Sequence, residues 1–289
     1  MEGRMRKSKF AVLMLLICTL LAGCIRPTSP DGGETSQNED MRETVVGYYT
    51  SVQYVYQSDV NEALLTTDMD EQYLLLMNKI HTLGADHAPE SITMLTCPTL
   101  YDKSVELETG VAKALYEMFD EMRAAGVTDI MVTSGYRTYD YQTMLFNNYL
   151  QYEQSTLSAD AYACLGADYI QETYLENGKS GLNPADALRV VKSYSAEPGK
   201  SEHQTGLCVD FITSEMNGSL TVAFEDTEAF AWLSKNAYKF GFILRYPKEK
   251  EEVTGYTYEP WHYRFVGREA ATDIHYGGLT LEEYLALMK

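Results

Sequence analysis

The sequence predicts an α+β fold, in which helices pack on one side of a small antiparallel sheet and a site lies in a cleft at the sheet. One observation is a set of short apolar stretches with strand character, at residues 129–134, 207–213, 242–246 and 256–265. The other is a set of longer segments whose apolar residues recur at helical spacing. No internal repeat interrupts this arrangement.

The clearest helix is predicted at residues 105–125, before Gly126, where five apolar residues share one face: Val111, Leu115, Met118, Phe119 and Met122. Asn183 is expected to cap a helix that begins at Pro184. Thr280 and Glu283 form a capping box for a terminal helix. Further helices are expected at about residues 140–152, 159–176 and 226–240, and the terminal one at 281–288.

The first 23 residues have the layout of a signal peptide, in which basic residues precede an apolar run from Phe10 to Ala22. The run is short for a membrane span. Leu21 to Cys24 resembles a bacterial lipoprotein processing site, which implies cleavage before Cys24 and acylation of its thiol. An uncleaved anchor and ordinary secretion are the alternatives. The expected location is the outer face of the cytoplasmic membrane, with a lipid on Cys24 as the attachment.

Beyond the signal peptide the chain is strongly acidic. Residues 1–23 hold four basic residues and one acid, so their removal leaves 19 basic and 41 acidic residues and a net charge of −22. This balance argues against a nucleic-acid partner, which requires basic patches. Residues 24–44 are expected to be a flexible tether and 45–289 a single catalytic domain. A disulfide between Cys97 and Cys164 is left open.

Two short motifs offer the chemistry of a metal site. Ser201–Phe211 carries His203 and Asp210, and Glu259-Pro260-Trp261-His262 follows about fifty residues later. A zinc hydrolase needs three protein ligands and a separate carboxylate that handles the proton. With His203, Asp210 and His262 as ligands, Glu259 remains as that base. Gly206 permits a turn after His203, and alternation along the following strand places Cys208 and Asp210 on one face.

These motifs resemble those of the VanY-type zinc D-alanyl-D-alanine carboxypeptidases, which share a fold group with D-Ala-D-Ala dipeptidases and hedgehog domains. His203 and Asp210 match the signature S-x-H-x-x-G-x-A-x-D, and Glu259–His262 matches E-x-W-H. Ser134–Thr138 with Gln142 matches S-G-Y-R-S-x-x-x-Q. The resemblance runs from about Tyr73, where residues 73–79 would form the opening strand, to the C-terminus.

The resemblance implies a zinc enzyme that trims the C-terminal D-Ala from peptidoglycan stem peptides. Glu259 would take a proton from water and pass it to the leaving amine. Arg137 would grip the terminal carboxylate, since a guanidinium binds a carboxylate through two parallel hydrogen bonds. The family suggests Gln142 and Ser201 as further substrate-binding residues. Trp261 lies between two site residues, where packing beneath the site is favoured over contact with substrate.

The chain departs from the family pattern at two positions. Thr138 stands where Ser is frequent, and Cys208 stands where Ala is usual. Cys208 could be a small buried residue that replaces Ala, which is the favoured interpretation, or a fourth zinc ligand that closes the open position.

Several functional alternatives remain open. Relatives cleave an L,D bond or free D-Ala-D-Ala, and the ligand set does not separate these activities. A non-catalytic zinc-containing peptidoglycan-binding module is the alternative from another class, but such a module has no need of a base such as Glu259. Residues 153–198 form an insertion before the metal motif, and it is expected either to shape substrate selection or to be a surface decoration.

Overall fold

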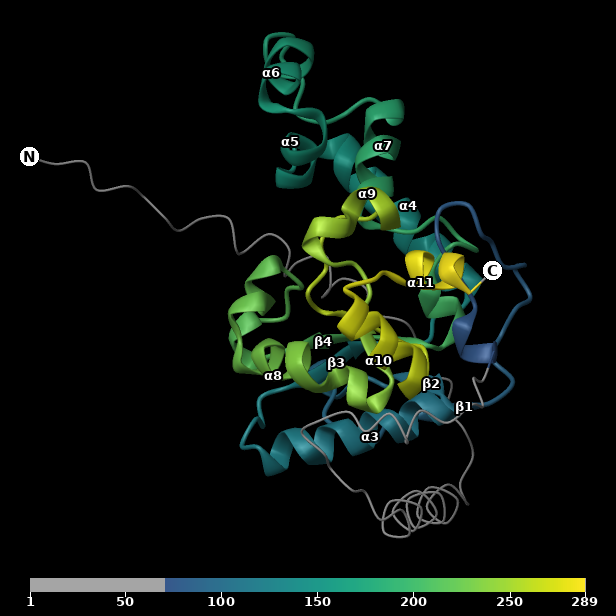
Figure 1. Cartoon of the computed structure of the whole chain (residues 1–289). Helices are drawn as coiled ribbons and strands as arrows, with labels where there is room; N and C mark the ends of the chain where they lie inside the picture. The colour runs from purple at the N-terminus through teal and green to yellow at the C-terminus, as the bar shows by residue number, and fades with distance from the viewer. Residues whose placement is uncertain (1–70, 289) are drawn as a thin grey trace, which may run out of the picture.

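The computed structural model describes residues 71–288 (Figure 1). The predicted signal peptide, the acylation site at Cys24 and the tether lie outside the described residues. Within residues 71–288, no helix combines the length and the apolar character that crossing a membrane requires.

A four-stranded antiparallel sheet forms the centre of the fold, as predicted. Its strands are β3 (Met131–Ser134), β4 (Cys208–Ile212), β6 (His262–Phe265) and β5 (Phe242–Leu244), in that spatial order. β4 and β6 are adjacent and antiparallel, so residues far apart in the chain stand opposite one another. A separate two-stranded sheet pairs β1 (Ile92–Met94) with β2 (Glu106–Glu108).

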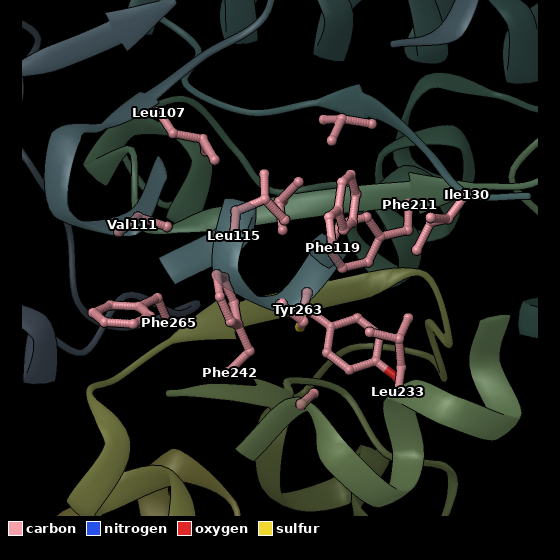
Figure 2. Close-up of a cluster of buried hydrophobic side chains, with 14 of the residues drawn as sticks. Leu107, Val111, Leu115, Phe119, Ile130, Phe211, Leu233, Phe242, Tyr263 and Phe265 are labelled. Carbon is pink, nitrogen blue, oxygen red and sulfur yellow. The ribbon is translucent and has the colours of Figure 1, made fainter. Parts of the chain in front are cut away.

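Helix α3 (Thr109–Ala124) packs against one face of this sheet. Figure 2 shows Leu115 and Phe119 of this helix among the side chains that reach it from the strands. The rings of Phe119 and Phe211 lie 5.8 Å apart between centroids. Alternation along β4 turns Phe211 into this core and Asp210 to the opposite face, so the fold reserves that face for polar groups.

The other helices surround the sheet or extend from it. Among them, α5, α6 and α7 gather with the end of α4 away from the sheet (Figure 1) and have a small core of their own. The α-helices are α4 (Tyr139–Ser155), α5 (Ala159–Leu165), α6 (Ala167–Ile170), α7 (Pro184–Tyr194), α8 (Glu228–Asn236), α9 (Glu251–Thr254), α10 (Arg268–Gly277) and α11 (Leu281–Leu287). Short 3-10 helices lie at Glu71–Leu74, Leu100–Asp102, Glu202–Thr205, Ser214–Met216, Val222–Asp226, Ala237–Phe240 and Lys248–Lys250, and a π-helix at Gln171–Leu175.

The predicted helix caps are confirmed. The Asn183 side chain accepts hydrogen bonds from the backbone of Ala185 and Asp186, with Pro184 in the first turn. Thr280 and Glu283 form the reciprocal capping box of α11. Both ends follow from side-chain oxygens that satisfy backbone N–H groups which a helix start leaves free.

Two helix predictions were too long. The helix predicted from residue 105 begins at Thr109, because Glu106–Glu108 pairs with β1 and the Glu108 carboxylate accepts from the Val111 N–H as a cap. The helix predicted over 159–176 is interrupted at Gly166, whose φ of 87° lies outside the helical region.

Two strand predictions were also wrong, one entirely and one in its extent. Residues 73–79 form no strand: a 3-10 turn ends at Leu74, and the carbonyls of Tyr73 and Leu75 accept hydrogen bonds from the Arg264 side chain. An arginine thus takes the place of a neighbouring strand. The strand predicted over 256–265 begins only at His262, because Pro260 has no N–H to donate and the chain turns there.

Candidate metal centre

The three predicted ligands come together on the polar face of the sheet. Asp210 of β4 stands directly opposite His262 of β6, and His203 enters from the 3-10 turn before β4. Asp210 Oδ1 lies 2.9 Å from His262 Nδ1, and Asp210 Oδ2 lies 3.2 Å from His203 Nε2. All three residues are buried, with 3–4 % of their surface exposed. One carboxylate therefore faces one nitrogen of each imidazole.

The second nitrogen of each imidazole faces an oxygen behind the site. His203 Nδ1 lies 2.6 Å from the Gly135 carbonyl oxygen, and His262 Nε2 lies 3.4 Å from Glu202 Oε2. Metal-bound histidines usually donate the other ring N–H to such an acceptor, which fixes the ring. His203 Nε2 and His262 Nδ1 then remain for a cation beside Asp210. Two imidazoles and a carboxylate are a common donor set of catalytic zinc.

Two glycines make this arrangement possible. Gly206 ends the 3-10 turn of His203 with a φ of 69°, in the left-handed region. Gly135 lies against β2, and a Cβ atom there would come 2.4 Å from the Glu106 carbonyl oxygen. A larger residue at Gly135 would therefore displace the carbonyl that holds His203.

Cys208 points to the polar face, as the alternation predicts. It is fully buried, and its Sγ forms a cluster with one nitrogen each of His203 and His262 in which all three atoms lie within 4.8 Å of one another. Burial alone would raise the pKa of the thiol, but the two imidazoles lower it to about 7. Among the described residues, Cys97, Cys164 and Cys208 are all free thiols, so the Cys97–Cys164 bridge does not form in this structure.

The charges of the cluster compensate one another. Burial would raise the pKa of Asp210, but His203 and His262 hold it well below its ordinary value. Burial and Arg137 would lower the pKa of His203, but Cys208 and Asp210 raise it to about 9. Without a metal the imidazoles therefore hold protons, and a dication that binds here takes their place.

Glu259 stands beside the cluster on a tight turn. The His262 N–H donates to the Glu259 carbonyl at 3.1 Å, which closes the turn through Pro260 and brings Glu259 Oε2 to 3.8 Å from His262 Nδ1. The pKa of the Glu259 carboxyl is raised to about 7, mainly by burial. His262 opposes this shift, and the Asp210 charge adds to it. A carboxyl that titrates near neutrality suits a group that both accepts and returns a proton.

Arg137 reaches the cluster from the loop after β3. It donates from Nη2 to Asp210 Oδ2 at 3.0 Å, from Nε to Ser134 Oγ at 2.8 Å and from Nη1 to Gln142 Oε1 at 3.4 Å. Its side chain is 20 % exposed. Gln142 in turn donates to the Ala196 carbonyl, so the family pair of Arg and Gln acts here as one hydrogen-bonded unit.

The remaining predicted site residues have structural contacts. The Ser201 hydroxyl accepts from the His203 N–H and caps its turn. Trp261 packs against the main core, and its carbonyl accepts from the Phe211 N–H. Thr138, which replaces the frequent Ser, still caps α4 by accepting from the Tyr141 N–H.

A buried charged group behind His262 was not predicted from the sequence. Glu202 Oε1 accepts from Arg245 Nε at 2.7 Å and from Arg264 Nη1 at 2.8 Å, and all three side chains have no exposed surface. One signal was available in the sequence. Arg264 lies two residues after His262, on the same face of a strand with buried neighbours, and a buried arginine requires a hydrogen-bonded or charged partner.

The sequence matches the VanY family, described as D-alanyl-D-alanine carboxypeptidase, over residues 104–268. The chain belongs to this family. The match includes the arginine motif, His203, Asp210, Glu259 and His262, the residues that the structure brings together. A D-alanyl-D-alanine carboxypeptidase of Enterococcus faecalis is 36 % identical over 218 residues, which cover 75 % of this chain and 67 % of the relative.

Solved structures of related enzymes have the same fold. The LD-carboxypeptidase LdcB aligns with a TM-score of 0.58 and 33 % identity, over 74 % of this chain and 86 % of that chain. VanYB in complex with D-alanine-D-alanine aligns at 0.56 and 33 %, over 75 % and 99 %. A zinc(II) complex of a VanY D,D-pentapeptidase aligns at 0.55 and 34 %, over 74 % and 99 %. The last of these structures holds zinc(II). The two imidazoles with the Asp210 carboxylate, and the Cys208 thiol beside the imidazoles, are donors that fit zinc in this chain.

Proposed function

We propose that this chain is a zinc-dependent carboxypeptidase that removes the C-terminal D-Ala from peptidoglycan stem peptides ending in D-Ala-D-Ala. The observation that carries the proposal is the convergence of His203, Asp210 and His262 on one buried point. Glu259 Oε2 lies 3.8 Å from His262 Nδ1, the ring nitrogen that faces this point. A binding module needs no buried carboxyl with a pKa near neutrality, so Glu259 supports catalysis over binding alone.

The chain divides the work among few side chains. His203 Nε2, Asp210 and His262 Nδ1 would hold the zinc, which when bound supplies a Lewis acid that activates water and polarises a carbonyl. Glu259 accepts the proton of the attacking water and delivers it to the amine of the departing D-Ala. Burial disfavours the charged form of the Glu259 carboxyl, so this group can keep the proton between the two transfers.

Arg137 would bind the free carboxylate of the substrate. Three oxygens of the protein hold its guanidinium: Ser134 Oγ, Gln142 Oε1 and Asp210 Oδ2. A side chain held in this way loses little rotational freedom when substrate binds. Its contact with Asp210 places the guanidinium beside the metal ligands, where the terminal residue of the substrate must lie.

Cleavage of an L,D bond is the second candidate function. The similarity to the LD-carboxypeptidase LdcB, with a TM-score of 0.58 and 33 % identity, supports it. The same ligands and the same base serve either reaction, so the choice depends on how the substrate is bound next to Arg137.

Purified zinc-loaded protein should be incubated with defined stem peptides and the products weighed. A pentapeptide ending in D-Ala-D-Ala should lose one alanine, and the proposal is contradicted if it stays intact. Loss of alanine from the tetrapeptide alone would establish the L,D-activity. Release of the intact dipeptide D-Ala-D-Ala would identify a dipeptidase instead.

We also propose that a lipid on Cys24 anchors the enzyme on the outer face of the cytoplasmic membrane. The support is the basic and apolar layout of residues 1–23 and the motif that ends at Cys24. Cys24→Ala should move the protein from the membrane fraction to the soluble fraction or leave it unprocessed. Unchanged processing and membrane attachment of that variant would contradict the proposed lipid anchor.

A further inference from the structure

The buried carboxylate of Glu202 lies directly behind one of the zinc ligands. Its Oε2 is 3.4 Å from His262 Nε2, on the side of the ring opposite Asp210. Glu202 immediately precedes His203 in the chain, and its side chain has no exposed surface. An ionised carboxylate only accepts hydrogen bonds, so the nitrogen that faces it must carry a proton.

Two arginines hold this carboxylate in place and keep it ionised. Arg245 Nε and Arg264 Nη1 both donate to Oε1, at 2.7 and 2.8 Å, which leaves Oε2 for His262. A charge buried this deeply persists only when it is paired and hydrogen-bonded.

The arginines are themselves held by distant parts of the chain. Arg245 donates from Nη1 and Nη2 to the Glu282 carboxylate of α11, at 2.9 and 2.7 Å. Arg264 donates from Nη2 to the carbonyls of Tyr73 and Leu75, at 3.0 and 2.7 Å. The support behind His262 thus extends to the start of the described chain and to its last helix.

The two histidine ligands need opposite tautomers. The Gly135 carbonyl faces Nδ1 of His203, so Nε2 is left for the metal, whereas Glu202 faces Nε2 of His262, so Nδ1 is left. A backbone carbonyl can only accept, and its position is fixed by the fold. Behind His262 a side chain has the same task, and a side chain needs its own support.

We propose that Glu202 is the positioning residue that fixes the ring and the Nε2–H tautomer of His262, and that Arg245, Arg264 and Glu282 hold Glu202 in place. This inference rests on the zinc site of the proposed function. It adds that α11, through Glu282, contributes to zinc affinity although none of its residues reaches the metal ligands.

Glu202→Gln tests the tautomer directly because it keeps the shape of the side chain. Its amide oxygen should stay with the two arginine donors, so its NH2 group faces His262 and favours a lone pair on Nε2. The proton then belongs on Nδ1, where zinc must bind. We expect zinc affinity, measured by competition with a chromogenic chelator, to fall about 10- to 100-fold.

Glu153→Gln is the matched control. Glu153 is another fully buried glutamate, but its partners are the hydroxyls of Ser158 and Tyr194 in the insertion. Its zinc affinity should equal that of the wild type. Glu282→Gln should weaken zinc binding by less than Glu202→Gln, because Glu202 keeps both arginines. Wild-type zinc affinity in Glu202→Gln, or an equal loss in Glu153→Gln, would overturn the inference.

Nitrogen-15 NMR of the zinc-loaded wild type decides the matter if Glu202→Gln does not fold. The inference expects the proton of the His262 ring on Nε2 and slow exchange of that proton with water. A proton on Nδ1, or rapid exchange at Nε2, would overturn it while the zinc enzyme itself stands. Failure of the wild type to bind zinc would instead contradict the proposed function.

Discussion

The zinc site and the insertion at residues 153–198, which begins in the last turn of α4, each bury a glutamate, and the two glutamates have opposite surroundings. Glu202 faces two arginines and a histidine, and its pKa lies below the usual range. Glu153 faces two hydroxyls, and burial raises its pKa. The surroundings of the same side chain thus favour its charged form in one region and shift it toward its neutral form in the other.

The two regions also differ in how far their support reaches. The buried core of the insertion consists of residues from 161 to 190, close together in the chain. The support of the zinc site joins Tyr73, Glu202, Arg264 and Glu282. Changes in this core of the insertion should therefore stay local, while changes around the site should reach the metal from a distance. The following predictions test this contrast, from the largest expected effect to the smallest.

Loss of a ligand should have the largest effect. His203→Ala, Asp210→Ala and His262→Ala should each lose zinc and all measurable peptidase activity, because zinc needs three protein ligands here. Elemental analysis after gel filtration measures the metal. His275→Ala is the control, since His275 stacks on Tyr238 away from the site, and it should keep its zinc. Retention of one zinc per chain in all three ligand variants would refute the assignment.

Loss of the base should remove activity and leave the metal. Glu259→Gln keeps the shape of the side chain but cannot accept a proton, so kcat should fall by roughly 10²- to 10⁴-fold. Zinc content should match the wild type. If Glu259→Gln loses its zinc, Glu259 is a ligand and the division of roles is wrong.

Loss of the guanidinium should weaken substrate selection. Arg137→Lys should lower kcat/KM on a free-acid peptide by about 10- to 100-fold, the value of hydrogen bonds to a charged group. The wild type should strongly prefer the free acid to the C-terminal amide. Equal turnover of the free acid and the amide by the wild type would contradict the proposal that Arg137 binds the substrate carboxylate.

The smallest effect belongs to the insertion. Because the folded pKa of Glu153 lies above its ordinary value of 4.5, its contribution to stability is full below that value and is lost as the pH rises through the folded pKa. Glu153→Gln cannot ionise, so its thermal stability relative to the wild type should improve from acid to neutral pH, by about 1 kcal/mol or less. A relative stability that declines over this range would contradict the raised pKa.

The convergence of the proposed metal ligands could be predicted from the sequence because their chemistry restricts them to few residue types at a fixed spacing. His203 and Asp210 lie in one motif, and alternation along a strand sets which residues share a face. Pro260 also disfavours a helical conformation at Glu259, which is a local effect of the sequence. These features depend on short stretches of chain.

The support of the site could not be predicted because it depends on long-range pairing. Arg245 and Glu282 are 37 residues apart, and Arg264 and Tyr73 are 191 apart. Nothing in either sequence stretch identifies its partner. The strand expected at residues 73–79 is a further example. Alternate carbonyls there accept hydrogen bonds as in a strand, but the donors are distant arginine side chains and not a neighbouring strand.

Zinc dependence of alanine release is the most direct test of the central claim. The wild-type protein should be stripped with a chelator, checked by elemental analysis, and assayed on a pentapeptide stem before and after zinc is returned. Alanine release should be lost on stripping and should recover when one zinc per chain is returned. Full activity in protein that holds no metal would contradict it.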